Sequence, residues 1–125
     1  MQPQVSTTTP STALPALMLE FLEHSKPELF ELGQIVCTRN VVSWAEDNLP
    51  GVLLEGSLWA RILIRAHCTG CWEELSNDDQ QLNRSSLEPG NEGRIFSAYT
   101  LLGEKIYVIT EWDRSVTTVL LASDY

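Results

Sequence analysis

The sequence predicts an α+β fold, in which a three- or four-stranded antiparallel sheet is packed by helices and preceded by a disordered N-terminal arm. Two observations predict this class. Apolar residues recur at helical spacing through much of the first two thirds of the chain, whereas the last third holds three short segments rich in β-branched and aromatic residues. Helices gathered between one early strand and a C-terminal meander are typical of α+β domains. The chain has 125 residues, 43% of them hydrophobic, and fits one such domain, which we place at residues 28–125.

The N-terminal part of the chain predicts two segments of different character. Residues 1–13 are mostly Thr, Ser, Pro and Gln, which bury too little apolar surface to offset the entropy of ordering, so we expect a disordered arm. Residues 14–27 predict an amphipathic helical extension, because apolar side chains recur three and four positions apart. We expect this helix to pack on its own domain, in a partner's groove, or against a second copy in a dimer formed through residues 14–24. Its apolar stripe consists of Leu14, Leu17, Met18, Phe21 and Leu22.

A short strand and a short helix are predicted next. Residues 32–38 predict a strand, since Ile35 and Val36 are β-branched and a glycine opens the segment. Residues 42–48 predict a helix that stops at the Pro-Gly pair shortly after it. The early strand is the candidate fourth member of the sheet.

Two further helices are predicted in the middle of the chain. Residues 52–67 carry apolar side chains around most of their circumference, which is typical of a central, largely buried helix, and Gly56 is expected to interrupt it near the start. The other helix is expected to be capped by Ser76 or Asn77, to have Asp78 and Asp79 in its first turn, and to continue through residues 80–87.

Three strands are predicted at the C-terminal end. Residues 94–101 and 104–111 alternate in the manner of strands and are separated by Leu-Gly, which predicts a β-hairpin with a tight turn. A second turn leads into a strand at residues 116–121. Consecutive antiparallel strands of this kind form a meander.

The net charge restricts the classes of partner. Eight Lys and Arg against 17 Asp and Glu give a formal charge of −9, which argues against a general nucleic-acid binder and against an anionic membrane as target. Six of the acids fall between residues 73 and 92, where Arg84 is the only basic residue. Such a run is either a plain solvated face or a docking surface for a Lys/Arg-rich partner. The predicted binding residues are Glu73, Glu74, Asp78, Asp79, Glu88 and Glu92, together with Asp113 in the later turn.

The cysteines indicate a reducing compartment and a weak metal signal. Three cysteines is an odd number, and no secretory signal is visible, so we expect a cytoplasmic protein. Cys68 and Cys71 form one Cys-x-x-Cys pair, and zinc needs four ligands, for which only Cys37, His67 and His24 remain. We therefore expect no metal and interpret the pair as small residues packing beside a helix end.

A longer pattern in the second half carries a family resemblance. Its runs are His67-x-x-Gly70-x-Trp72-x-x-Leu75, Asp79, Asn83, Arg94-x-x-Ser97-Ala98-Tyr99, Lys105-Ile106-x-Val108-Ile109-Thr110-Glu111-x-Asp113-Arg114-Ser115-x-Thr117-Thr118, and Tyr125. This pattern resembles a family of small bacterial proteins of unknown function, labelled plasmid-related and carried on plasmids and integrative elements. The match covers residues 30–125, and Cys71, Glu73 and Trp112 depart from the family pattern. The resemblance implies an accessory role on a mobile element and supplies no mechanism.

Four residues form an alternative catalytic set. His67, Arg94, Glu111 and Arg114 are the residue types of a general acid–base ribonuclease, namely a base, an acid and a phosphate clamp. A helix followed by an antiparallel meander is similar in outline to barnase-like and RelE-like ribonucleases, which is an analogy of fold alone. The structural alternative is a histidine that ends a helix and an Arg94–Glu111 cross-strand ion pair. In that alternative, side-chain hydrogen bonds organise the turn before the last strand, and they come from Asp113, Arg114, Ser115 and Thr117.

The sequence therefore favours a non-enzymatic acidic binding protein of a bacterial mobile element. We expect it to inhibit or modulate a host nucleic-acid-handling complex, such as a defence complex, by binding a basic protein surface. No cofactor, no membrane contact and no direct nucleic-acid contact are expected. The ribonuclease with a His/Arg/Glu site is the alternative.

Overall fold

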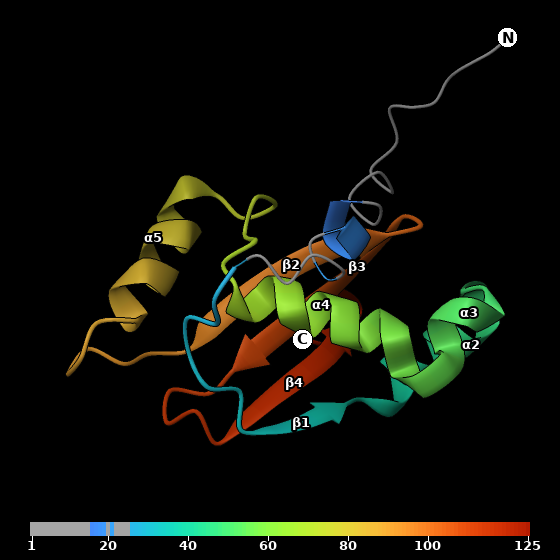
Figure 1. Ribbon diagram of the computed structural model, residues 1–125, viewed down its shortest axis with the longest axis horizontal. Helices are drawn as coiled ribbons and strands as arrows, with labels where there is room; N and C mark the ends of the chain where they lie inside the picture. Colours follow the sequence, from blue (N-terminus) through green and yellow to red (C-terminus); the bar gives the residue numbers. More distant parts are fainter. Residues whose placement is uncertain (1–15, 20, 22–25) are drawn as a thin grey trace, which may run out of the picture.

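The computed structural model describes residues 16–19, 21 and 26–125 (Figure 1). The predicted disordered arm at 1–13 lies outside the described residues, as do 14, 15, 20 and 22–25 of the predicted helical extension. The α+β class is confirmed. The elements are β1 (Gln34–Cys37), α2 (Arg39–Asn48), α3 (Gly51–Leu54), a 3-10 turn (Glu55–Ser57), α4 (Leu58–Cys68), α5 (Asn77–Ser86), β2 (Ile95–Leu101), β3 (Glu104–Thr110), β4 (Val116–Leu121) and a last 3-10 turn (Ala122–Asp124).

The sheet has four strands in the order β1-β4-β3-β2. Strands β2, β3 and β4 form the predicted antiparallel meander, while β1 pairs with β4 in parallel. The prediction of a wholly antiparallel sheet is therefore wrong at β1, and the sheet is mixed. The residue pattern of a strand carries no information on its direction, and the helices between β1 and β2 allow the chain to return from either end.

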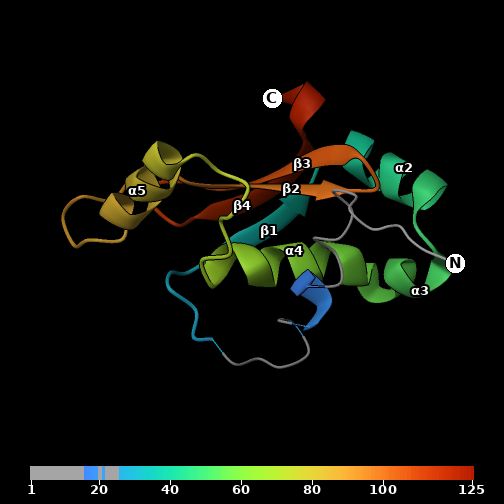
Figure 2. The same ribbon diagram turned by 90° about the horizontal axis from the view of Figure 1, so that it is seen from above.

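Helices cover one face of the sheet. Figure 2 shows α4 lying along this face and the N-terminal helical segment, residues 16–19 and 21, on the far side of α4. Leu17 is buried in the same apolar core as α4 and the strands, and Met18 and Phe21 pack against that core. The described part of the predicted extension thus folds back on its own domain. The opposite face of the sheet carries the C-terminal turn (Figure 2).

Local signals explain where the helices begin and break. Thr38 caps α2 by accepting a hydrogen bond from the Val41 N–H, so the helix starts earlier than residue 42. Ser76 caps α5 in the same way. Gly56 and Ser57 have positive φ angles of 58° and 53°, which separates α3 from α4 and confirms the predicted interruption.

The edge of the sheet at β2 is closed by side chains. Asn83 of α5 donates to the Phe96 carbonyl (2.8 Å) and accepts from the Phe96 N–H (3.1 Å), as a neighbouring strand would. The Glu74 carboxylate accepts from the Thr100 N–H (2.8 Å) and from the Thr100 hydroxyl (2.7 Å). Pairing of another chain with β2 is thereby blocked. None of the described helices is long and apolar enough to cross a membrane.

Candidate functional site

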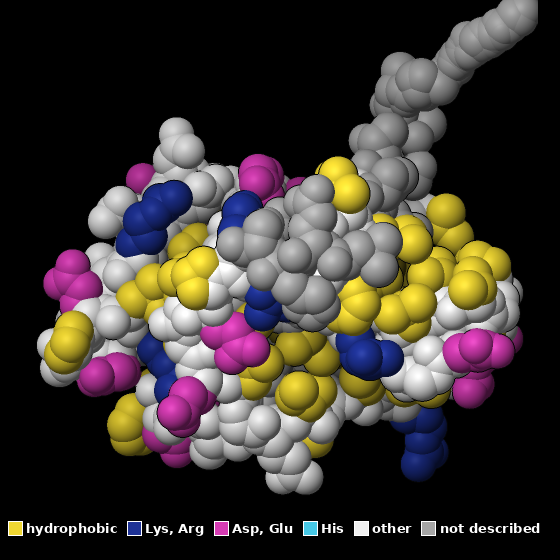
Figure 3. Space-filling model, viewed as in Figure 1, with side chains coloured by type: hydrophobic (Ala, Val, Ile, Leu, Met, Phe, Trp, Pro, Cys, Tyr) yellow, Lys and Arg dark blue, Asp and Glu magenta, His cyan; other side chains and the backbone are white. Residues whose placement is uncertain are grey.

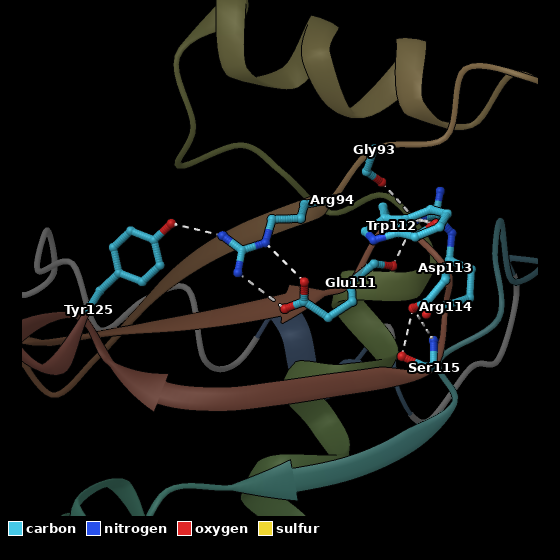
Figure 4. Close-up of polar contacts among 8 residues, drawn as sticks. All are labelled: Gly93, Arg94, Glu111, Trp112, Asp113, Arg114, Ser115 and Tyr125. Carbon is cyan, nitrogen blue, oxygen red and sulfur yellow. Dashed lines mark hydrogen bonds and ion pairs between the residues drawn. The ribbon is translucent and has the colours of Figure 1, made fainter.

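The turn between β3 and β4 is built by three consecutive polar residues (Figure 4). One Asp113 oxygen accepts from the Ser115 N–H (3.1 Å) and from the Ser115 hydroxyl (2.6 Å). These bonds lower the pKa of Asp113. Arg114 takes a positive φ of 60° between them, a conformation that an Asx turn supports. Asp113, predicted as a binding residue, therefore has a local structural role.

The Arg114 side chain fastens this turn to two distant parts of the chain. Its guanidinium donates to the carbonyl of Ser86 (2.8 Å), the last residue of α5, and to the carbonyl of Gly93 (2.7 Å), shortly before β2. It also donates to the carbonyls of Glu111 (3.1 Å) and Trp112 (3.2 Å) within the turn. Both terminal nitrogens of the guanidinium donate to backbone oxygens, which leaves the group poorly placed to clamp a phosphate.

Arg94 and Glu111 form a bidentate ion pair across β2 and β3 (Figure 4). The two bonds measure 3.1 and 3.2 Å, and the hydrogen bond to Glu111 raises the pKa of Arg94. A further Arg94 nitrogen donates to the Tyr125 hydroxyl (3.3 Å). This is the cross-strand ion pair expected as the structural alternative to a catalytic role.

His67 lies at the C-terminal end of α4 with none of its surface exposed. Burial lowers its pKa from 6.5 to about 3, and the positive charge of Arg114 contributes in the same direction. The ring is therefore neutral at pH 7. A general base needs access to its substrate, and this ring has none in the described structure.

A directed chain of hydrogen bonds fixes the tautomer of His67. Thr117 donates to the Leu32 carbonyl (2.7 Å), so its oxygen accepts from Thr110 (2.6 Å). The Thr110 hydrogen is then used, and Thr110 must accept from Nε2–H of His67 (2.8 Å). Nδ1 consequently accepts from the Ser97 hydroxyl (2.5 Å). Both ring nitrogens are satisfied inside the protein, which explains how a buried histidine is tolerated.

The structure thus gives the four residues of the alternative catalytic set separate tasks. His67 is buried beneath the sheet, Arg114 binds carbonyls, and Arg94 is paired with Glu111 at the surface. The side chains of Arg94 and Glu111 are 52% and 30% exposed, whereas His67 is inaccessible, so the four do not meet in one open cleft.

The predicted acidic surface gathers around α5. Figure 3 shows acidic side chains on the α5 side of the molecule. Glu74 and Glu92 have structural roles, since Glu74 binds Thr100 and Glu92 accepts from the Gly90 N–H (3.1 Å). Hydrogen bonds to backbone N–H groups lower the pKa of Glu92. The remaining carboxylates are exposed and make no hydrogen bond or ion pair within the part of the chain that the structure describes, and they belong to Glu73, Asp78, Asp79 and Glu88.

The cysteines do not assemble a metal site among the described residues. Cys68 and Cys71 are buried, and Cys37 is half-buried. No group of three or more His, Cys, Asp or Glu in the described ranges is arranged to hold a metal ion. Burial raises the pKa of the Cys68 thiol, which makes it a poor nucleophile at neutral pH.

Several structurally important side chains were missed in the sequence. Ser97, Thr110 and Thr117 are polar residues on the apolar face of their strands, and that pattern is the signal for a buried hydrogen-bond network. Leu82 is 64% exposed in the middle of α5, where it lies among the acidic residues.

Comparison of the chain with protein-family models, with curated proteins and with solved structures finds no match.

Proposed function

We propose that this protein is a non-enzymatic binding protein of a bacterial mobile element, and that the surface of α5 docks on a basic protein surface. The proposed partner is a host nucleic-acid-handling complex, which the protein inhibits or modulates. The mobile-element origin rests on the family resemblance of residues 30–125. The docking site rests on the distribution of charge and of exposed side chains.

One observation carries the proposal. The basic and titratable groups suited to catalysis are used inside the protein, while the carboxylates of Asp78, Asp79 and Glu88 are left to solvent. Desolvating these carboxylates against Lys or Arg of a partner replaces water with charge-assisted hydrogen bonds. Charge complementarity of this kind accelerates association and makes it sensitive to salt.

Leu82 supplies the apolar contact that an acidic surface alone lacks. It lies four residues after Asp78 and three after Asp79, so all three side chains share one side of α5. At 64% exposure, its side chain is available to enter a partner's pocket. An apolar anchor surrounded by charge is a common arrangement at protein interfaces.

The experiment compares two triple charge reversals that change the net charge equally. Asp78→Lys, Asp79→Lys and Glu88→Lys alter the α5 surface, while Glu46→Lys, Asp47→Lys and Glu55→Lys alter exposed acids elsewhere. Affinity capture from host lysate, read by mass spectrometry, should recover basic subunits of a nucleic-acid-handling complex with the wild type and with the second variant only. Purified subunits should then bind at least about tenfold more weakly to the first variant. Equal recovery with both variants would contradict the proposed surface.

A further inference from the structure

The two edges of the sheet are treated differently by the fold. The β2 edge is closed by Asn83 and Glu74, whereas β1 is the last strand on the other side. Figure 1 shows β1 along the margin of the molecule, with no described element beyond it. An open edge strand is a template for pairing with another strand.

The hydrogen bonds to β4 show which groups of β1 remain available. Gln34 donates to the Ser115 carbonyl and Thr38 to the Val119 carbonyl, both at 3.0 Å. In a parallel ladder, alternate residues face the neighbouring strand. Ile35 and Cys37 therefore direct their N–H and C=O groups away from β4, toward the open side.

The side chains of β1 are also incompletely covered. Ile35 is 46% exposed and Val36 is 36% exposed. Successive residues of a strand face opposite sides of the sheet, so apolar surface is available on both faces of this edge. A partner that pairs with β1 would gain hydrogen bonds and bury both side chains.

We propose that β1 pairs antiparallel with β1 of a second copy of this chain, about a two-fold axis at Val36. Ile35 of each copy then lies opposite Cys37 of the other, and all four residues exchange N–H···O=C bonds. Val36 faces Val36 of the second copy as a non-hydrogen-bonded pair. The two four-stranded sheets join into one continuous sheet.

Charge favours a second copy over an unrelated strand. Glu31 precedes β1 and Arg39 follows it, and both are exposed. Antiparallel pairing about Val36 brings the start of β1 in one copy beside the end of β1 in the other, so Glu31 of one copy and Arg39, the first residue of α2, of the other flank the same end of the interface. An interface of two-fold symmetry must be self-complementary, and an acid before the strand with a base after it meets that requirement.

The first test is a disulfide across the proposed axis. In a Cys37→Ala background, Val36→Cys should form a linked dimer under mild oxidation, because non-hydrogen-bonded partners lie about 4.5 Å apart between Cα atoms. Val52→Cys in the same background is the matched control, since Val52 is 66% exposed on α3. At least about tenfold more dimer is expected for Val36→Cys. Equal or no linkage in the two variants would overturn the proposal.

The second test measures the mass of the unlinked protein by sedimentation equilibrium. Ile35→Pro should shift the wild-type dimer to monomer without unfolding it, because the Ile35 N–H makes no bond to β4. Glu31→Arg and Arg39→Glu should each weaken the dimer about tenfold, and the double variant should restore it. At about 100 μM even a weak dimer would be populated, so a wild type that is still monomeric at that concentration would overturn the pairing. Absence of rescue in the double variant would overturn the two-fold arrangement.

Discussion

The imidazole of His67 is held neutral inside the protein by burial and by its bonds to Ser97 and Thr110. Because the unfolded chain binds a proton near pH 6.5 and the folded chain only near pH 3, the unfolded state carries the extra proton between these values. Folding stability contributed by His67 is therefore complete above pH 6.5 and is lost as the pH falls.

We predict a loss of about 1.4 kcal/mol of unfolding free energy per pH unit from this group between pH 6 and pH 4. The measurement is urea denaturation of the wild type and of His67→Gln across that range. The variant should be less stable than the wild type at pH 7. On acidification it should lose less stability than the wild type, because its carboxylates titrate but its residue 67 does not. Parallel pH profiles of the two proteins would contradict the assignment.

Gly33 is a second residue whose identity the fold requires. It has a φ of 65°, and a Cβ there would overlap the backbone of Arg114 and Ser115. Gly103 also has a positive φ, of 82°, but nothing lies near its Cβ position. We predict that Gly33→Ala costs about 3 kcal/mol or more, while Gly103→Ala costs about 1–2 kcal/mol. Thermal unfolding of both variants checks the difference, and equal costs would show that the close approach is absent.

The residues that carry the family resemblance turn out to be structural where the contacts are visible. Asp113 and Ser115 build the turn, Arg114 fastens it, and Thr110 and Thr117 extend from it into the buried network. Of these residues, Arg114 also belonged to the alternative catalytic set, together with His67, Arg94 and Glu111. Only the burial of His67 and the acceptors of Arg114 distinguish the two interpretations, and neither is visible without tertiary structure.

At the scale of elements, the short β2–β3 hairpin and strand β4 were predictable because their signals are local. The turn residues at 102 and 103 and the alternating side chains fix the meander within a residue or so. The start of α2 and the direction of β1 were not, since the former depends on a cap and the latter on pairing with a strand far along the chain. The acidic run of α5 was predicted, but not the role of Glu74 as an edge cap.

Closure of the β2 edge is an element-scale property that one side chain supports. Asn83 is 2% exposed and makes two bonds to Phe96, so its removal leaves two backbone groups unsatisfied. We predict that Asn83→Ala lowers the unfolding free energy by about 2 kcal/mol and raises the rate of aggregation. Chemical denaturation and light scattering check this, with Asn77→Ala on the same helix as the control. An aggregation rate equal to that of the control would contradict the capping role.

For the whole molecule, exposed carboxylates that contribute to the net charge of −9 can be located relative to the sheet. Free carboxylates surround α5 beside β2, while the open edge of β1 lies at the other end of the strand order. The proposed docking surface and the proposed dimer interface therefore use opposite sides of the sheet. Occupation of one leaves the other accessible, so a dimer would present two α5 surfaces to its partners.

The parallel pairing of β1 with β4 has a consequence for how the chain folds during synthesis. Among the described strands β1 is synthesised first, but β4, the strand it pairs with, begins only at Val116, after β2 and β3. Until β4 is made, Ile35 and Val36 lack the strand they pair with, and the pairing that forms then joins segments far apart in the sequence. β1 is consequently expected to join the sheet only after the β2–β3–β4 meander has been synthesised, and until then the nascent chain carries an unpaired apolar segment.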